Sequence, residues 1–388
     1  MRLGVDLRCL QDTNRTGVGE VAWQTMQALG ARSSVELVGF ANAAGRVDLP
    51  PQLERVVKVV RTNVPNKIKN LSLFLKLGQP IDVLLEEKTG KKLDALWLPN
   101  PSFAYVSSNT PVVLTVHDLS FIHFPQFFSR RGHLWYFPAV RRLLSQGLPA
   151  GSAVVAVSQH TADDLAEQFP KLTASLRVVN PGITRDYFES PTAEELVAVR
   201  NRLHVPEHFL LSVGTVEPRK NYQLLLSVYD QLLKQDPHYP YDLVIAGGWG
   251  WRSGGLRKLY QRLASRNRIH FVGYVSELEK RALYAQAELF LYPSYYEGFG
   301  IPPLEAMASG VPVLVSHASS LPEVVGNAGV LLSPLNPAVW LEALQWLQRD
   351  QKALAQYRTL GRARAREFSW ERAADGYYAV FKELTTKV

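Results

Sequence analysis

Short runs of aliphatic and β-branched residues alternate along the chain with segments whose apolar residues recur at helical spacing. In the first half, this pattern predicts strands at residues 3–7, 35–40, 95–98, 112–116 and 153–157. The same rhythm starts again in the second half, at residues 209–213, 241–246, 269–272, 289–291 and 313–315. Strands that alternate with helices form mostly parallel sheets with helices on their faces. We therefore expect an α/β protein with two Rossmann-like, doubly wound domains facing a cleft.

The junction between the two domains is expected near residues 180–206. There a strand pattern ends at Gly182, and a polar helical pattern at residues 192–202 leads to Pro206. Near the end of the chain, four apolar residues recur at helical spacing: Ala374, Tyr377, Tyr378 and Phe381. The expected units are residues 1–185, residues 186–368, and a C-terminal helix at residues 369–388 that returns to the N-terminal domain.

The composition fits a protein with two hydrophobic cores. Its 388 residues, 46% of them hydrophobic and 20% charged, are typical of a globular chain that is long enough for two domains. The single Cys9 cannot form an intrachain disulfide, which favours a reducing compartment. The sequence begins with a strand pattern rather than a signal peptide, and it has no run of about 18 apolar residues. We expect a cytoplasmic protein.

The formal charge of +8 predicts an attraction to polyanions. Nucleic acid, an anionic membrane and a phosphorylated small molecule are the possible partners. The chain has no basic run interleaved with aromatic residues, and no zinc-finger, homeodomain or RRM pattern. This argues against nucleic acid.

Two adjacent cations follow a predicted strand at residues 209–213. Gly214 ends that strand and Asn221 opens a helical pattern, so Arg219 and Lys220 should lie at the carboxyl edge of a parallel sheet. Doubly wound folds bind ligands at this edge. An Arg and a Lys beside a helix N-terminus suit a diphosphate, because one forms bidentate hydrogen bonds and the other is a point charge. The alternative is a solvated surface pair.

A second segment, residues 292–310, contains two carboxylates and a glycine-rich loop. Gly298 and Gly300 would let backbone N–H groups approach an anionic ligand. Glu297 lies in the loop and Glu305 near the start of a helix, with seven residues between them, so both can face one cleft. Alternatively, Glu305 is a favourable first-turn acid and Glu297 a surface residue. The presence of both segments together favours a binding site.

These segments resemble the signature of glycosyltransferase family 4, the large retaining family with the GT-B fold. The resemblance lies in Glu297-x7-Glu305 with its surrounding residues, and in residues 218–221, 247–248 and 272–275, which cover the second half of the chain. In the first half, three shorter motifs occur in the order of the family: Thr16-Gly17-Val18-Gly19, Val116-His117-Asp118 and Val157-Ser158.

The resemblance implies a role for each matching residue around a nucleotide-sugar donor. Arg219 and Lys220 would neutralise the diphosphate leaving group. Glu297 would hold the hydroxyls of the donor sugar, together with the backbone of Gly298, Phe299 and Gly300. Glu305 would bind the ribose hydroxyls, and the backbone around Val275 would meet the base.

In the N-terminal half, the resemblance places Gly17 and Gly19 where they leave room for phosphate or acceptor across the cleft. His117 would lie near the reacting carbon and orient a sugar hydroxyl. With Lys220 and Glu297 it makes up the expected catalytic set. The alternative for His117 is a core histidine that caps a strand end.

No metal ion or other cofactor is expected. Asp-x-Asp, which could hold a divalent ion between two phosphates, does not occur in the sequence. The resemblance implies transfer with retention, in which the departing phosphate helps to deprotonate the acceptor. No dedicated general base is then required.

The identity of the sugar depends on weaker motifs in the first half. Asp6-x-Arg8, residues 16–19 and residues 116–121 before Phe124-Pro125 resemble mannosyltransferases of bacterial O-antigen and exopolysaccharide assembly. This implies transfer of a hexose, mannose from GDP-mannose, to a glycan on a polyprenyl diphosphate. UDP-glucose, dTDP-rhamnose and GDP-rhamnose are alternative donors. Another activity on the GT-B fold, such as a nucleotide-sugar epimerase or a phosphorylase, is a further alternative, but the sequence supports neither the pyridoxal phosphate lysine nor the longer chain of phosphorylases. A non-catalytic subunit of a polysaccharide-assembly complex is the alternative from another class.

Two basic, apolar segments of the first half suggest contact with a membrane. At residues 66–77, a helical pattern places Ile68, Leu71, Phe74 and Leu75 on one face, near Lys67, Lys69 and Lys76. Residues 130–137, followed by Arg141 and Arg142, combine aromatic and basic side chains. Such segments can lie in the headgroup plane of an anionic bilayer, here the inner face of the cytoplasmic membrane. The alternative is that both are ordinary helices packed on their own domain.

Overall fold

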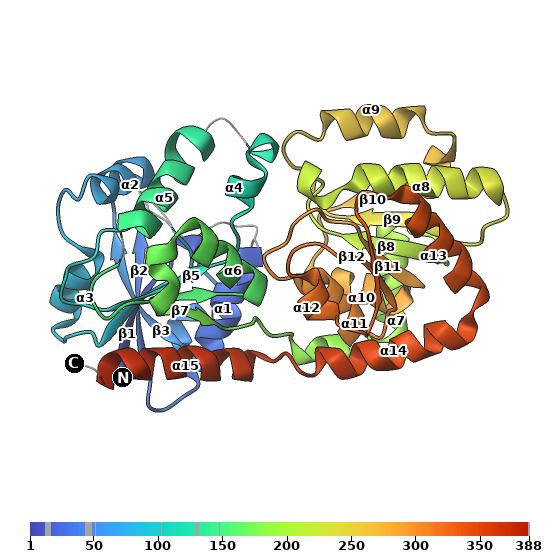
Figure 1. Ribbon diagram of the computed structural model, residues 1–388. Coiled ribbons are helices and arrows are strands. Elements are labelled where there is room, and N and C mark those ends of the chain that lie inside the picture. Colours follow the sequence, from blue (N-terminus) through green and yellow to red (C-terminus); the bar gives the residue numbers. More distant parts are fainter. Residues whose placement is uncertain are drawn as a thin grey trace. The chain divides into compact units, whose positions relative to one another are not determined.

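The computed structural model describes residues 1–11, 17–42, 49–50, 52–101, 103–128, 132–146 and 148–386. The expectations for Thr16, Arg130 and Arg131 lie outside these residues, as does the expectation for the side chain of Lys67. The chain forms two compact units (Figure 1). The first comprises Met1–Phe121, Ser129–Gly182 and Ser369–Val388, and the second comprises Ile122–Phe128 and Ile183–Phe368. Domain boundaries at residues 185 and 368 remain our proposal.

The first unit contains a parallel sheet of seven strands in the order β3-β2-β1-β4-β5-β6-β7. The strands are β1 (Arg2–Asp6), β2 (Glu36–Asn42), β3 (Val57–Thr62), β4 (Ala95–Leu98), β5 (Val112–Val116), β6 (Ala153–Ala156) and β7 (Leu176–Val178). The helices are α1 (Gly17–Gly30), α2 (Asn66–Phe74), α3 (Ile81–Thr89), α4 (Ser120–His123), α5 (Phe137–Gln146), α6 (Gln159–Gln168) and α15 (Trp370–Thr386). Helix α4 ends in the second unit.

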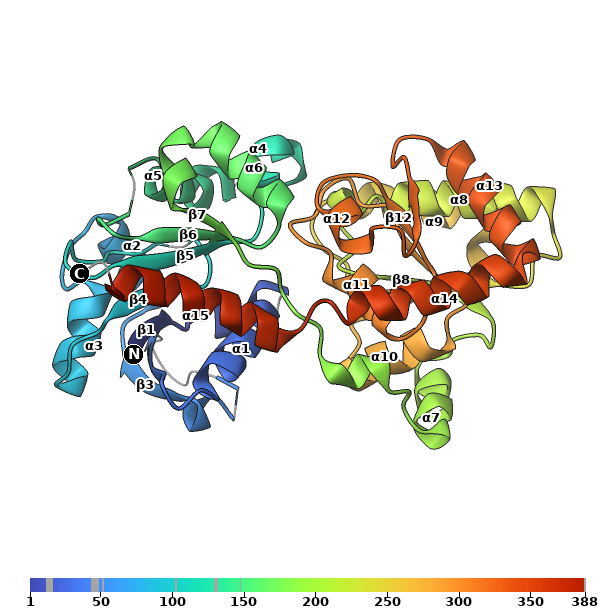
Figure 2. The ribbon, with the colours of Figure 1, turned by 60° about the horizontal axis from the view of Figure 1, so that its bottom comes forward.

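The C-terminal helix α15 packs against α1 and the sheet of the first unit, as expected (Figure 2). Tyr377 packs on Trp97 with ring centroids 5.0 Å apart, and both side chains bond to the hydroxyl of Thr115. Gly182, the last residue of its segment in the first unit, contacts the backbone of Ser369 and Trp370, where the chain re-enters that unit. A Cβ atom on Gly182 would lie 2.2 Å from the backbone nitrogen of Trp370, so only glycine fits there.

The second unit contains a parallel sheet of six strands in the order β10-β9-β8-β11-β12-β13. The strands are β8 (Phe209–Val213), β9 (Asp242–Ala246), β10 (Ile269–Gly273), β11 (Leu289–Tyr292), β12 (Val313–Ser316) and β13 (Val330–Leu332). The helices are α7 (Ala193–Leu203), α8 (Tyr222–Gln235), α9 (Gly254–Arg262), α10 (Glu277–Gln286), α11 (Ile301–Ala308), α12 (Leu321–Val325), α13 (Pro337–Arg349) and α14 (Gln351–Ala365). This is the strand order of dinucleotide-binding sheets, whose direction of winding reverses between β8 and β11.

The doubly wound α/β class is confirmed, and all ten expected strands are present. β4, β5 and β8 have the expected bounds, and the other seven are shifted slightly at their ends. The sequence analysis gave no bounds for three strands, β3, β7 and β13, although it expected a strand to end at Gly182, shortly after β7. Each of the three lies at the edge of a sheet. Charged residues interrupt β3 and β7, and β13 has only three residues, so none of the three forms a long apolar run. Their residues are partly exposed, because an edge strand is covered less completely. No helix in the described part of the chain is long and apolar enough to span a bilayer.

Candidate functional site

Arg219, Lys220 and Glu297 come together at the switch point of the second sheet. Arg219 and Lys220 lie in the 3-10 turn η7 (Pro218–Lys220) that follows β8, and Glu297 lies in the loop that follows β11. Because β8 and β11 are parallel neighbours, these two loops meet at one edge of the sheet. Lys220 Nζ donates to Glu297 Oε1 at 2.7 Å, and Arg219 Nη1 donates to Glu297 Oε2 at 2.8 Å.

A fourth charged residue, Glu217, completes this arrangement. Its Oε1 lies 3.0 Å from Arg219 Nη2. We call Glu217, Arg219, Lys220 and Glu297 the charge cluster; it pairs two cations with two carboxylates. The sequence analysis overlooked Glu217, because its role depends on the direction in which the Arg219 side chain points.

Burial makes the charges of this cluster interdependent. Lys220 and Glu297 are only 8% and 6% exposed. Burial lowers the pKa of Lys220, against the opposing effect of Glu297. Burial alone would raise the pKa of Glu297, but Arg219 and Lys220 outweigh it and lower the pKa to about 2. The alternative of a solvated surface pair is therefore wrong for Lys220, and the alternative of a surface residue is wrong for Glu297.

The loop that carries Glu297 is fixed by hydrogen bonds from a neighbouring loop. The backbone N–H of Glu297 donates to Ser319 Oγ at 2.8 Å. Ser320 Oγ lies 2.8 Å from the carbonyl oxygens of both Glu297 and Phe299. Gly300 caps α11 with φ at +117°, a conformation that favours glycine. Ser319 and Ser320 were not found from the sequence, since they follow a different strand, β12.

Glu305 belongs to a second buried cluster rather than to the charge cluster. It is 5% exposed, and its carboxylate accepts from Lys280 Nζ at 2.6 Å and from the hydroxyls of Tyr187 and Tyr284, each at 3.0 Å. Burial raises the pKa of Glu305, although Lys280 counteracts this effect. The interpretation of Glu305 as a merely favourable first-turn acid is therefore incomplete, because three side chains fix its carboxylate.

The remaining predicted donor residues of the second unit lie in loops after strands. Val275 is half-buried in the loop between β10 and α10. Gly298 is buried between Glu297 and Phe299. The ring of Phe299 is also buried and packs edge-on against Phe368, with centroids 5.6 Å apart.

His117, Gly17 and Gly19 belong to the first unit. His117 directly follows β5, and its Nε2 lies 2.8 Å from the carbonyl oxygen of Pro99. Since a carbonyl only accepts, Nε2 carries the proton. Burial lowers the pKa of His117, so the ring is neutral and Nδ1 has an acceptor lone pair. Gly17 begins α1, where a Cβ atom would meet nothing within 4 Å, and Gly19 is buried in the same turn.

The described residues contain no group of three His, Cys, Asp or Glu side chains that could hold a metal ion. Independence from metal ions remains a prediction about the reaction, to be tested by chelation. The charge cluster already supplies two fixed cations at the sheet edge, where an anionic ligand would bind.

Comparisons with known proteins cover nearly the whole chain. The family model described as Glycosyltransferase Family 4 matches residues 15–187, and the model described as Glycosyl transferases group 1 matches residues 197–364. The chain is 30% identical to the O-antigen chain mannosyltransferase B of Escherichia coli over 379 residues, which covers 95% of this chain and 96% of that protein.

Two solved structures share the fold over the full length. Sucrose-phosphate synthase from Thermosynechococcus elongatus superposes with a TM-score of 0.77 at 20% identity, covering 100% of both chains. Anabaena HepE in complex with UDP and glucose superposes with a TM-score of 0.70 at 18% identity, covering 98% of this chain and 99% of that chain. At these identities the likeness concerns the fold alone.

Proposed function

This chain belongs to glycosyltransferase family 4, the group 1 glycosyl transferases with the GT-B fold, and we propose that it moves mannose from GDP-mannose to a growing glycan. It is a retaining glycosyltransferase, as its family is. The choice of mannose rests on the 30% identity to an O-antigen mannosyltransferase over 95% of the chain. The acceptor that this similarity favours is a glycan on a polyprenyl diphosphate, in the synthesis of a cell-surface polysaccharide.

The charge cluster is the observation that best supports catalysis. Arg219 and Lys220 stand at the sheet edge where a diphosphate binds in doubly wound folds, and both are paired with Glu297. A diphosphate that attracts these cations would compete with Glu297 for them. The Glu297 carboxylate would then be released to accept hydrogen bonds from the donor sugar's hydroxyls. Binding of the phosphate and orientation of the sugar would thus be coupled.

The other residues have supporting roles in this proposal. Glu305 accepts three hydrogen bonds from the protein, and a carboxylate has about four acceptor positions, so one position remains for a ribose hydroxyl. The backbone at Val275 meets the base, and the backbone of Gly298, Phe299 and Gly300 meets the sugar. His117 accepts from a sugar hydroxyl through Nδ1. Gly17 and Gly19 leave space for phosphate or acceptor.

A polyprenyl-linked acceptor is anchored in a membrane, so the enzyme has to reach it at the membrane surface. We propose a cytoplasmic protein that contacts the inner face of the cytoplasmic membrane peripherally, through the first unit. Exposed apolar residues on and after α2 support this contact: Ile68, Leu71, Leu75 and Leu77 are each 48–60% exposed. UDP-glucose is the second candidate donor, because HepE, which shares the fold, binds UDP and glucose.

The proposal is tested with a panel of GDP-mannose, GDP-rhamnose, UDP-glucose and dTDP-rhamnose. The purified protein is mixed with each donor without a glycan acceptor, so that water takes the sugar. The nucleotide released by this hydrolysis and the thermal shift are measured. We expect the fastest release and the largest upward shift with GDP-mannose, since a ligand stabilises the state that binds it. Faster nucleotide release and a larger thermal shift with UDP-glucose would show that the donor sugar is glucose rather than mannose. The control variant is Lys352→Ala, which changes an exposed lysine of α14. If Lys220→Ala released nucleotide as fast as this control, the charge cluster would have no role in catalysis.

A further inference from the structure

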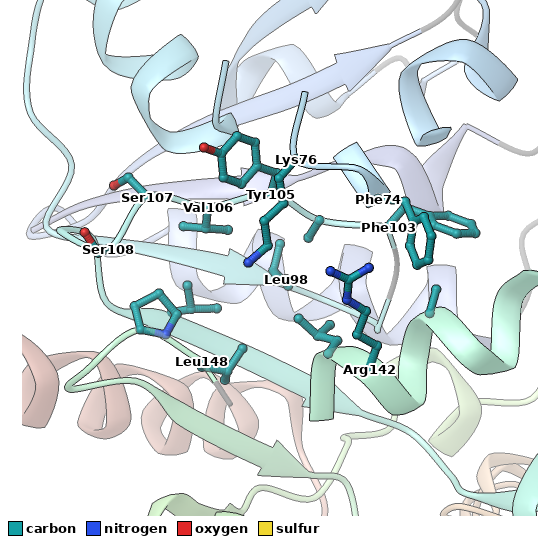
Figure 3. A pocket seen from close by; sticks show the side chains of 15 residues that line it. Phe74, Lys76, Leu98, Phe103, Tyr105, Val106, Ser107, Ser108, Arg142 and Leu148 are labelled. Atoms are coloured by element: carbon teal, nitrogen blue, oxygen red, sulfur yellow. The ribbon is translucent and has the colours of Figure 1, made fainter. Parts of the chain in front are cut away.

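The first unit contains a cavity of about 290 Å³ that the proposed donor site does not use. It lies between the C-terminal end of α2, the loop that precedes β5, and helix α5 (Figure 3). Its wall combines apolar residues, which include Leu98, Phe103, Ala139, Leu143 and Leu148, with the polar side chains of Ser107 and Ser108. We call it the α2–α5 cavity. Its volume is at the lower limit of pockets that hold small ligands, about 300 Å³.

Two cations face this space. Figure 3 shows the ammonium group of Lys76 and the guanidinium group of Arg142 directed into the cavity. None of the described residues that line it is acidic. The carboxylate of nearby Asp82 is buried and accepts from the backbone N–H and the hydroxyl of Ser107. An anion between Lys76 and Arg142 would be stabilised by both.

Hydrocarbon surface begins directly beside these cations. The Arg142 guanidinium lies over the ring of Phe74 at 5.1 Å, and the Phe74 and Phe103 rings pack edge-on at 6.0 Å. Outside the cavity, Leu75 and Leu77 flank Lys76 in the chain and are 50% and 59% exposed. A ligand that fits both features has an anionic group joined closely to a hydrocarbon chain.

We propose that the α2–α5 cavity binds the phosphate of a lipid whose hydrocarbon chain begins at the phosphate ester, as in a polyprenyl phosphate or diphosphate. The first part of the chain lies on the apolar part of the wall and the remainder runs toward the exposed leucines. A glycerophospholipid fits less well, because polar glycerol esters separate its phosphate from its chains. This inference rests on the proposed function, since it assigns a place to the lipid of the acceptor.

The inference is tested by calorimetric titration of the full chain with four probes: geranyl diphosphate, its two fragments inorganic pyrophosphate and geraniol, and short-chain phosphatidylglycerol. We expect geranyl diphosphate to bind at one site and at least about tenfold more tightly than either fragment. Lys76→Glu and Arg142→Glu should each weaken this binding by about tenfold or more. The matched control is Lys91→Glu, which reverses an exposed charge of the same unit away from the cavity. All three positions are exposed, and circular dichroism checks the fold.

Four results would overturn the inference. Equal affinity for pyrophosphate and geranyl diphosphate would reduce the cavity to an anion site, and equal affinity for short-chain phosphatidylglycerol would show a general phospholipid site. Binding that neither cavity variant weakens would place the ligand elsewhere. Nucleotide release from GDP-mannose is measured on the same samples. Release without geranyl diphosphate binding overturns this inference alone, whereas binding without release from any donor overturns the proposed function alone.

Discussion

The charge cluster of the second unit and the α2–α5 cavity of the first unit both place an Arg and a Lys together, but in opposite surroundings. In the charge cluster, Arg219 and Lys220 are paired with Glu297 and largely removed from solvent. In the cavity, Lys76 and Arg142 are exposed and face a partly apolar wall with no acidic residue among the described lining. Cations paired within the fold are held in a fixed geometry that suits catalysis, whereas cations beside exposed apolar surface suit the binding of an amphiphilic partner.

The largest expected effect comes from breaking the charge cluster. Lys220→Ala and Glu297→Ala should each lower the transfer rate by at least about a hundredfold, the effect of losing one electrostatic stabiliser. Their positions in loops would suggest an unchanged fold, but both side chains are buried, so each variant should also lower the melting temperature. Initial rates and thermal melts measure the two effects. A near-native rate for either variant, compared with Lys352→Ala, would contradict the proposal.

The buried pairing of Glu297, which the cations of the cavity lack, should make the stability of the protein depend on pH. The folded-state pKa of Glu297 lies at about 2, below the ordinary value of 4.5. Its contribution to stability is therefore complete above about pH 4.5 and is lost as the pH falls toward 2. Glu297→Gln should lack this loss, so the stability difference between the native protein and the variant should shrink as the pH is lowered from 5 to 3. Urea unfolding at each pH measures it; a constant difference would show that the carboxylate is not held ionised.

A smaller effect is expected from the exposed residues of the first unit. Vesicles with anionic lipid should sediment the protein at low salt, and binding should fade as salt screens the charges. Lys76→Glu should lower the partition coefficient by several fold, because each cation near an anionic surface contributes about 1 kcal/mol. Leu71→Gln with Leu75→Gln should also lower it, since both leucines are about half exposed. Equal binding to neutral vesicles, or none to anionic vesicles at low salt, would refute the membrane contact; Lys91→Glu is the control for charge.

The smallest expected effect is that of chelation. EDTA should leave the transfer rate unchanged, because Arg219 and Lys220 supply the positive charge that a metal would otherwise bring to the diphosphate. Initial rates with and without EDTA test this. If EDTA abolished transfer and magnesium restored it, the charge cluster would not be sufficient.

The class of fold and the positions of the principal charged residues could be predicted from the sequence. Buried strands of a parallel sheet are continuous apolar runs, so β4, β5 and β8 were predicted with their observed bounds. Arg219 and Lys220 were identifiable because they are adjacent in sequence and follow such a strand. A residue's place after a strand is a local property, which a local pattern can show.

Which of these residues contact one another depends on the order of the strands and could not be predicted from local patterns. Lys220 and Glu297 are separated by 77 positions and touch because β8 and β11 are neighbours in the sheet. Tyr187 reaches Glu305 across 118 positions, and Ser319 holds Glu297 from the loop after β12. The helical pattern at residues 66–77 grouped Phe74 with apolar residues that are exposed, yet Phe74 packs on Phe103. The same pattern grouped Lys69 with the lysines expected to face a membrane, yet its ammonium lies over the Phe40 ring at 5.7 Å. Periodicity along one segment shows which residues share a face, but the order of the strands and the packing of the elements decide what that face contacts.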